Sequence, residues 1–295
     1  MLHRFLTTLA VASVCLCASP AVPNASTAPP DESEPTFDAA PLPSDAEFAR
    51  AARTDPLLML NLVAKRYKIA KSEGDKQAIA VYTASFHKRE RIGGELHPQE
   101  VIRVAYREEP YAVLMHWEQG SRRHVEGTLF AAGQNEGKML VKHRFLGVLA
   151  FDPKGSNPRS SARYTIEEFG FYHSTKRALR AWTHAASLGS LQWSYVGTRN
   201  VPDASNRECH IVMRTCAVDE IDAFAGGEAS PPITASNRAD SVRTVTLYFD
   251  AKTWLQVGSE LRRADGELSG SYFFRDVTLN PSLPADSFTR AALRK

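Results

Sequence analysis

Between Tyr82 and Trp117 the sequence alternates aromatic or aliphatic residues with charged ones, and the pattern is interrupted twice. Gly93-Gly94 is a turn signal, because glycine occupies positive φ angles at little cost. Glu109-Pro110 is a break, because proline cannot donate a hydrogen bond to a β-ladder. The alternation predicts three strands, over Tyr82–Ile92, Glu100–Glu108 and Tyr111–Gln119. Strands joined by short turns pair antiparallel, so the sequence predicts an antiparallel meander here.

The rest of the chain repeats this pattern of alternating segments between turn residues. Turn signals stand at Gly133–Gly137 and Asp265-Gly266, and Asp219–Asn237 predicts a long loop. Together with the first three, the remaining segments make roughly ten strands. They cover Val125–Ala131, Lys138–Leu149, Leu191–Arg199, Glu208–Arg214, Val242–Phe249, Leu255–Arg263 and Ser269–Thr278.

Two segments show helical spacing instead. The first begins near Ser44-Asp45, repeats apolar residues every three or four positions as far as Tyr67, and ends at Gly74. Asp55-Pro56 within it forms an N-cap and first-turn pair. The second spans Thr165–Leu188. Both helices are expected to lie on the sheet, so the predicted fold class is α+β.

The N-terminal residues are typical of an exported protein. Met1–Ala18 has a basic start, an apolar run and then small residues, which predicts a secretory signal too short to span a bilayer comfortably. We therefore divide the chain into a signal peptide (1–21), a disordered proline-rich tether (22–44) and one domain (45–295). The predicted location is the periplasm. Anchoring to the membrane, through a retained signal or a lipidated cysteine, stays an alternative.

Cys209 and Cys216 would lie in that oxidising compartment. Their spacing, with no second cysteine pair, is wrong for a zinc site. We predict a disulfide between them, which would stabilise the fold by roughly 2–3 kcal/mol unless loop strain cancels the gain. Two buried thiols are the alternative.

Charge and motifs argue against several classes of function. The net charge of +3, with no long basic run, argues against nucleic-acid binding. The nine histidines form no HxH, HExxH or Cys/His pattern. Ser187-Leu188-Gly189-Ser190 lacks the leading glycine of a nucleophile elbow, and the sequence contains no glycine-rich phosphate loop. We expect a protein that is not an enzyme and has no metal or cofactor, with an envelope hydrolase as the lesser alternative.

Several pieces of the chain match one family in order and spacing. They are Phe86–Arg91, Gly94, Pro110–Val113, Trp117, Gly133–Lys138, Asp152-Pro153, Ser161–Ile166, Tyr248–Asp250, Leu255, Gly266 and Asn280–Phe288. Over roughly residues 55 to 290 the chain resembles an uncharacterised secreted bacterial family of the LolA-like class, the outer-membrane lipoprotein-sorting carriers. The resemblance implies a highly curved antiparallel sheet, a half-barrel, with helices on its concave face.

Aromatic residues occur on nearly every predicted strand, and alternate residues of a strand share one face of a sheet. If the helices fill the space above that face, these residues are an ordinary core. If the helices leave a gap, the same residues line a cavity for an apolar chain. The candidate ligand-binding residues are Tyr82, Phe86, Tyr111, Val113, Met115, Trp117, Phe130, Trp193, Tyr195 and Tyr248, together with Arg163. Arg163 is a candidate clamp for a carboxylate or phosphate headgroup, the alternative being an ion pair with Asp152 or Glu167.

The predicted function is a carrier or sensor in the cell envelope. Its expected partner is a lipid, an acylated envelope protein or another apolar molecule, with contact to the membrane surface and a monomeric state. The alternative is a protein-interaction module like the RseB-type stress sensors of the same class, which would use the Asp219–Asn237 loop or an exposed sheet edge. An apolar cavity of several hundred Å³ favours the carrier. Three or more titratable groups converging with shifted pKa values favour an enzyme.

Overall fold

The structure, a computed structural model, describes residues 44–69, 79–159, 161–220, 234–235 and 238–294. The predicted signal peptide and nearly all of the predicted tether lie outside these residues, as do Gly74 and most of the predicted loop at Asp219–Asn237. None of the described helices is both long and apolar enough to cross a membrane.

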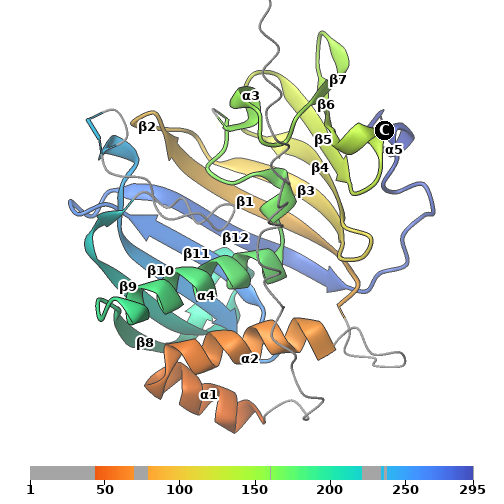
Figure 1. The fold of residues 1–295 in the computed structure, drawn as a ribbon. Helices are drawn as coiled ribbons and strands as arrows, with labels where there is room; N and C mark the ends of the chain where they lie inside the picture. Colours follow the sequence, from red (N-terminus) through yellow and green to blue (C-terminus); the bar gives the residue numbers. More distant parts are fainter. Residues whose placement is uncertain (1–43, 70–78, 160, 221–233, 236–237, 295) are drawn as a thin grey trace, which may run out of the picture. The chain divides into compact units, whose positions relative to one another are not determined.

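The described strands form a twelve-stranded antiparallel sheet (Figure 1). Its order is β7-β6-β5-β4-β3-β1-β12-β11-β10-β9-β8, with β2 paired to β1. Two meanders, β1–β7 and β8–β12, meet where β1 pairs with β12. The antiparallel prediction is confirmed. The strands are β1 Val81–Ile92, β2 Glu95–Leu96, β3 Glu100–Arg107, β4 Ala112–Gln119, β5 Val125–Ala131, β6 Met139–His143, β7 Gly147–Phe151, β8 Gln192–Val201, β9 Arg207–Glu220, β10 Val242–Asp250, β11 Gln256–Arg262 and β12 Leu268–Leu279.

Two of the predicted strands differ substantially from the structure, whereas the ends of the others agree to within two residues. The segment Lys138–Leu149 is two strands, β6 and β7, because the chain turns back before Gly147, which has a φ of 73°. Strand β9 continues beyond Arg214 as far as Glu220, with a shift of register against β10. Between the pairs Val242–Glu220 and Thr244–Thr215 strand β9 contains more residues than β10, so strict alternation does not show where such a strand ends.

The first predicted helix is two helices, α1 (Asp45–Thr54) and α2 (Pro56–Ile69). Asp55 separates them in an extended conformation, and its carboxylate accepts a hydrogen bond from the backbone N–H of Leu58 at 2.9 Å. The predicted N-cap role of Asp55 is therefore confirmed, and the cap explains why a new helix starts at this point.

The second predicted helix begins later than its periodicity indicates. It consists of a 3₁₀ turn, η2 (Ile166–Glu168), and then α4 (Phe171–Ser187). Gly170 lies between them with a φ of 117°, and a Cβ at this position would lie 2.8 Å from the ring of Tyr106. The remaining short elements are α3 Ser156–Arg159, α5 Arg290–Arg294, η1 Asn135–Gly137, η3 Pro202–Ala204 and η4 Arg238–Asp240.

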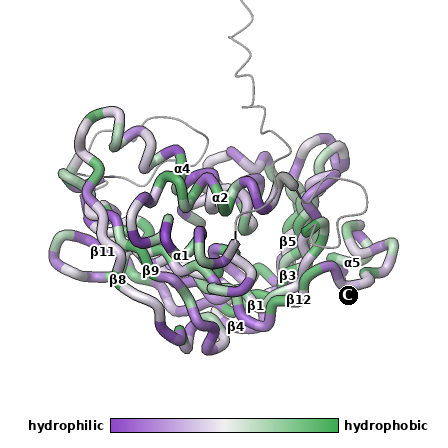
Figure 2. Tube along the Cα trace, turned by 90° about the horizontal axis from the view of Figure 1, so that it is seen from below, coloured by the Kyte–Doolittle hydropathy of each residue, from purple (hydrophilic) through white to green (hydrophobic). Residues whose placement is uncertain are grey.

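Figure 2 shows the sheet curving around α1, α2 and α4, so the predicted curved sheet with helices on its concave face is confirmed. The main core, which includes Phe48 and Trp182, lies between these helices and the strands. A second, smaller core lies on the other face of β4–β6, where Leu114 belongs to one cluster with Phe288 and Leu293. The two faces of β4 thus belong to different cores, as expected for a strand buried on both sides.

The predicted disulfide is wrong. Cys209 and Cys216 are both buried and lie on the same strand, β9, where they do not bond to each other. Seven residues of extended strand separate their Cα atoms by roughly 23 Å. A disulfide joins Cα atoms that are less than about 7 Å apart. Short spacing in the sequence closes a loop only when the chain turns between the cysteines, and here it does not.

Helix α1 is held to the sheet by aromatic contacts of Phe48, with Trp254 and with His210 of β9. The ring of Phe48 stacks on Trp254 with 4.7 Å between centroids, and Trp254 Nε1 donates a hydrogen bond to Asp45 at 3.0 Å. We expect Phe48→Ala to lower the free energy of unfolding by about 3–5 kcal/mol, because it leaves a cavity in a fully buried site. Urea denaturation followed by circular dichroism measures this. The exposed Arg50→Ala in the same helix should change it by less than about 0.5 kcal/mol.

Candidate functional site

A cavity of about 450 Å³ lies on the concave face of the sheet. Its floor is made by residues of eight neighbouring strands, from β7 through β1 to β11. The cavity is covered by residues 161–170, which we call the covering segment, and by the first turns of α4. Protein interiors contain few voids larger than a water molecule, so a space of this size is a distinct feature of the fold.

The register of the strands explains why the floor is mostly apolar. Val104, Met115, Thr128, Val141 and Leu149 are paired one with the next across five strands. Directly opposed residues project from the same face, so these side chains form a row that crosses the sheet. All of them except Val104 line the cavity, which therefore runs across the strands.

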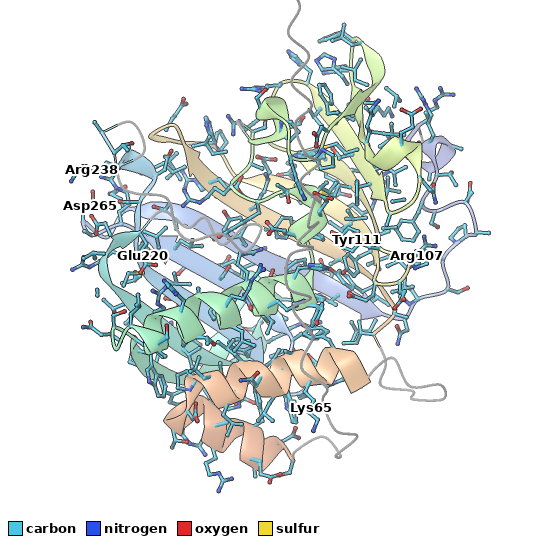
Figure 3. The ribbon with its side chains drawn as sticks, viewed as in Figure 1. Lys65, Arg107, Tyr111, Glu220, Arg238 and Asp265 are labelled. Atoms are coloured by element: carbon cyan, nitrogen blue, oxygen red, sulfur yellow. The ribbon has the colours of Figure 1, made fainter. Side chains whose placement is uncertain are left out.

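The covering segment is fastened to the sheet by Tyr111, which lies beside it in Figure 3. The hydroxyl of Tyr111 donates to the backbone carbonyl of Ile166 at 2.5 Å and approaches that of Phe169 at 3.2 Å. The ring of Phe169 in turn meets Phe86 edge to face, with 5.1 Å between centroids. Gly170 then lets the chain pass close to Tyr106 and enter α4.

One part of the cavity wall is charged. Lys88 Nζ lies 3.2 Å from Glu90 and 3.5 Å from Glu100, and all three residues are buried. Tyr272 donates its hydroxyl to Glu90 at 2.8 Å, and the indole N–H of Trp117 donates to Glu100. We call Lys88, Glu90, Glu100, Tyr272 and Trp117 the buried ion cluster.

The pKa shifts in the buried ion cluster are those of a stable ion pair. Burial by itself lowers the pKa of Lys88, but the carboxylates of Glu90 and Glu100 raise it above its ordinary value. Burial likewise raises the pKa of Glu90, but Lys88 and the Tyr272 hydroxyl hold it below its ordinary value. A general acid or base works best with a pKa near the working pH. The pKa values of Lys88 and Glu90 are instead shifted away from that range, toward the charged forms of both groups.

The candidate residues named from the sequence have different places in the structure. Phe86, Met115 and Trp117 line the cavity. Four others lie outside the lining and pack in the main core on the concave face: Tyr82, Tyr111, Val113 and Phe130. Trp193 and Tyr195 also lie outside the lining, on β8 at the far edge of the sheet. Tyr248 also lies outside the lining and donates its hydroxyl to Glu260 at 3.0 Å.

Arg163 is used to hold the covering segment. Its guanidinium donates to the backbone carbonyls of Arg91 at 3.2 Å and Asp240 at 3.0 Å. Its own backbone N–H approaches Glu90 at 3.4 Å. These bonds connect the covering segment to the buried ion cluster, and Arg163 itself does not line the cavity.

Trp117 of the buried ion cluster was among the candidates predicted from the sequence, whereas Lys88, Glu90, Glu100 and Tyr272 were not. The inward-facing positions of β1 continue past Phe86 to Lys88 and Glu90, as its burial pattern shows. The sequence did contain a signal for this polar site. Alternation places Lys88 and Glu90 at inward-facing positions, and charged groups are rarely buried without partners.

A family model described as "Protein of unknown function (DUF1571)" matches residues 79–292. The chain belongs to the DUF1571 family. None of the curated proteins matches it.

The chain is also similar to several solved structures. Pseudomonas aeruginosa MucB in its complex with MucA is 13% identical, with 79% of this chain and 62% of that chain covered and a TM-score of 0.42. Mycobacterium tuberculosis lipoprotein LppX is 13% identical, with coverage of 79% and 100% and a TM-score of 0.40. A LolA superfamily protein from Nitrosomonas europaea is 10% identical, with coverage of 79% and 99% and a TM-score of 0.30.

The buried ion cluster generates a prediction for stability. Lys88→Met leaves two buried carboxylates without their cation, so we expect a loss of about 3–5 kcal/mol in the free energy of unfolding at pH 7. Lys138→Met is the matched control, because Lys138 pairs with Glu136 at 3.1 Å in an exposed site, and it should cost less than about 1 kcal/mol.

The pH dependence of the free energy of unfolding provides a second test of the role of Lys88. In the wild type the pKa of Glu90 is lowered, so its stabilising contribution is present above 4.5 and is lost as the pH falls below that value. In Lys88→Met, Glu90 loses the cation that offsets its burial, so its pKa should rise and stability should increase as the pH is lowered from 7 to 5. Equal urea midpoints for Lys88→Met at these two pH values would contradict this role of Lys88.

Proposed function

We propose that this protein binds one long apolar chain, of a lipid or an acylated protein, and acts in the cell envelope as a carrier or sensor rather than as an enzyme. The observation that carries the proposal is the cavity of about 450 Å³ on the concave face of the sheet. Small-molecule sites typically enclose roughly 300–1,000 Å³ and have mainly apolar walls. The envelope location rests on the predicted secretory signal.

The shape of the cavity suits a chain better than a compact ligand. Its lining comes from eight neighbouring strands, which at about 4.8 Å per strand corresponds to an arc of roughly 34 Å along the sheet. A space that crosses this many strands accommodates an extended acyl chain along the row of Met115, Val141 and Leu149.

The energy available from such a chain is sufficient for binding. Burying a methylene contributes about 0.8 kcal/mol, so a chain of a dozen contributes on the order of 10 kcal/mol. Association and ordering cost on the order of 4–15 kcal/mol, so only long chains should bind detectably. Each added methylene should tighten binding by about fourfold until the cavity is full.

An opening for the ligand lies beside the β6–β7 hairpin. Leu146 and Arg123 belong to the cavity lining and are exposed, and Phe145 at the tip of the hairpin is 70% exposed. An apolar chain can enter here without crossing the main core, which suits transfer from a membrane or from another protein.

The test is to fill the cavity. N-phenyl-1-naphthylamine, a neutral dye that brightens in apolar surroundings, should bind the wild type and be displaced by 1-hexadecanol but not by 1-octanol. Val141→Trp places an indole in the cavity and should weaken hexadecanol binding by at least about tenfold. Val218→Trp is the matched control, since Val218 is 66% exposed on β9 and outside the cavity, and it should bind like the wild type.

Both variants must retain the wild-type circular dichroism spectrum, and Val141→Phe provides a smaller filling group if the tryptophan prevents folding. Failure of every alkanol to displace the dye from the wild type, or equal binding by the cavity-filling and control variants, would contradict the proposal.

A further inference from the structure

The opening of the cavity contains an unsatisfied cationic group. Arg122 lines the cavity, and its Nη1 is buried without a hydrogen-bond acceptor among the described residues. Buried polar atoms are nearly always hydrogen-bonded in folded proteins, and a guanidinium N–H is a strong donor. An unpaired donor facing a cavity is therefore a position at which a ligand acceptor would be favoured.

The backbone holds Arg122 there in a tight turn. The N–H of Val125 donates to the carbonyl of Arg122 at 3.2 Å, and the two residues between them, Arg123 and His124, have φ of 51° and 56°. This is the geometry of a type I′ hairpin, which strongly prefers Asn-Gly or Asp-Gly. Arg123 has a conformation that its side chain disfavours, and such strain is concentrated at functional sites.

A second donor stands on the neighbouring strand. His143 is the register partner of Val125 and also lines the cavity. Its Nδ1 accepts the backbone N–H groups of Phe145 at 3.1 Å and Leu146 at 3.3 Å. Because Nδ1 accepts, the hydrogen of the neutral ring is on Nε2, which is then a donor.

Carboxylates also lie around the cavity: Glu168 lines it, and Glu126, Glu90 and Glu100 each have a cationic partner. Glu126 pairs with Lys142 at 3.6 Å and approaches Arg144 at 3.9 Å. Glu90 and Glu100 belong to the buried ion cluster with Lys88. The charged side chains that line the cavity are Lys88, Arg122, Arg123 and Arg177 against Glu90, Glu100 and Glu168, an excess of one positive charge, which favours an anion.

We infer that the ligand is an anionic amphiphile whose carboxylate or phosphate group binds Arg122, with His143 Nε2–H as a second donor, while its apolar chain lies in the cavity. This inference rests on the proposed function and specifies the class of ligand. A guanidinium suits both groups, because it binds carboxylate and phosphate oxygens through paired N–H donors.

The experiment compares four ligands on the full chain at pH 7.5, by displacement of N-phenyl-1-naphthylamine. Hexadecanoate and hexadecyl phosphate should each bind about tenfold to a hundredfold more tightly than 1-hexadecanol, which has the same chain without the charge. Inorganic phosphate alone should neither displace the dye nor compete with hexadecyl phosphate at millimolar concentration, because it lacks the chain.

Arg122→Gln should remove this preference and leave the affinity for 1-hexadecanol unchanged. Arg122→Lys keeps the charge without the paired donors and should retain part of the preference. Arg144→Gln is the matched control, because Arg144 is exposed, lies outside the cavity and carries the same charge, and it should behave like the wild type.

Equal wild-type affinity for hexadecanol and hexadecanoate would overturn the inference and leave the proposed function standing. The inference would likewise be overturned by competition from inorganic phosphate, which indicates a site for free anions, or by equal effects of Arg122→Gln and Arg144→Gln, which indicate a general effect of charge. If none of the sixteen-carbon ligands binds, the proposed function fails first, and the inference fails with it.

Discussion

The pairing of β1 with β12 is the interaction on which the rest of the sheet depends. It places Phe86 opposite Phe274, residues from the two ends of the domain, and joins the meander β1–β7 to the meander β8–β12. The other neighbouring pairs in the sheet are consecutive along the chain, apart from β1 and β3, which have the short β2 between them. Closing the long connection between β1 and β12 costs chain entropy, which the aromatic contacts across this pair offset.

The inner face of β1 changes in character along the strand, and this change positions the cavity. Its first half presents Tyr82, whose ring packs 4.5 Å from that of Phe171 on α4. Its second half presents Lys88 and Glu90, whose charges must be paired within the sheet. The helix covers the apolar half closely. The polar half lies under the covering segment, and the cavity lies between that segment and the sheet.

The cavity therefore joins two kinds of wall that rarely meet in a protein interior. A row of apolar side chains crosses the strands, while the buried ion cluster and the donors near Arg122 lie along its edges. The groups of the buried ion cluster are hydrogen-bonded to one another and do not need a ligand. The Nη1 of Arg122, by contrast, is buried without an acceptor among the described residues. This contrast separates a group that stabilises the fold from one available for recognition.

Much of the fold follows from the sequence alone. Alternation located nearly all the strands and showed that Phe86, Met115 and Trp117 face the interior, because the side-chain period of a strand is a local property. The cap at Asp55 was equally visible, since its partner Leu58 is three residues away. Whether the concave face is filled was not visible, because that depends on how residues 161–170 pass over strands distant in the chain. Tertiary structure alone decided the start of α4, where Gly170 meets Tyr106, and the separation of Cys209 from Cys216 along one straight strand. Local spacing determines which way a side chain points, and only the packing of remote segments determines what, if anything, meets it there.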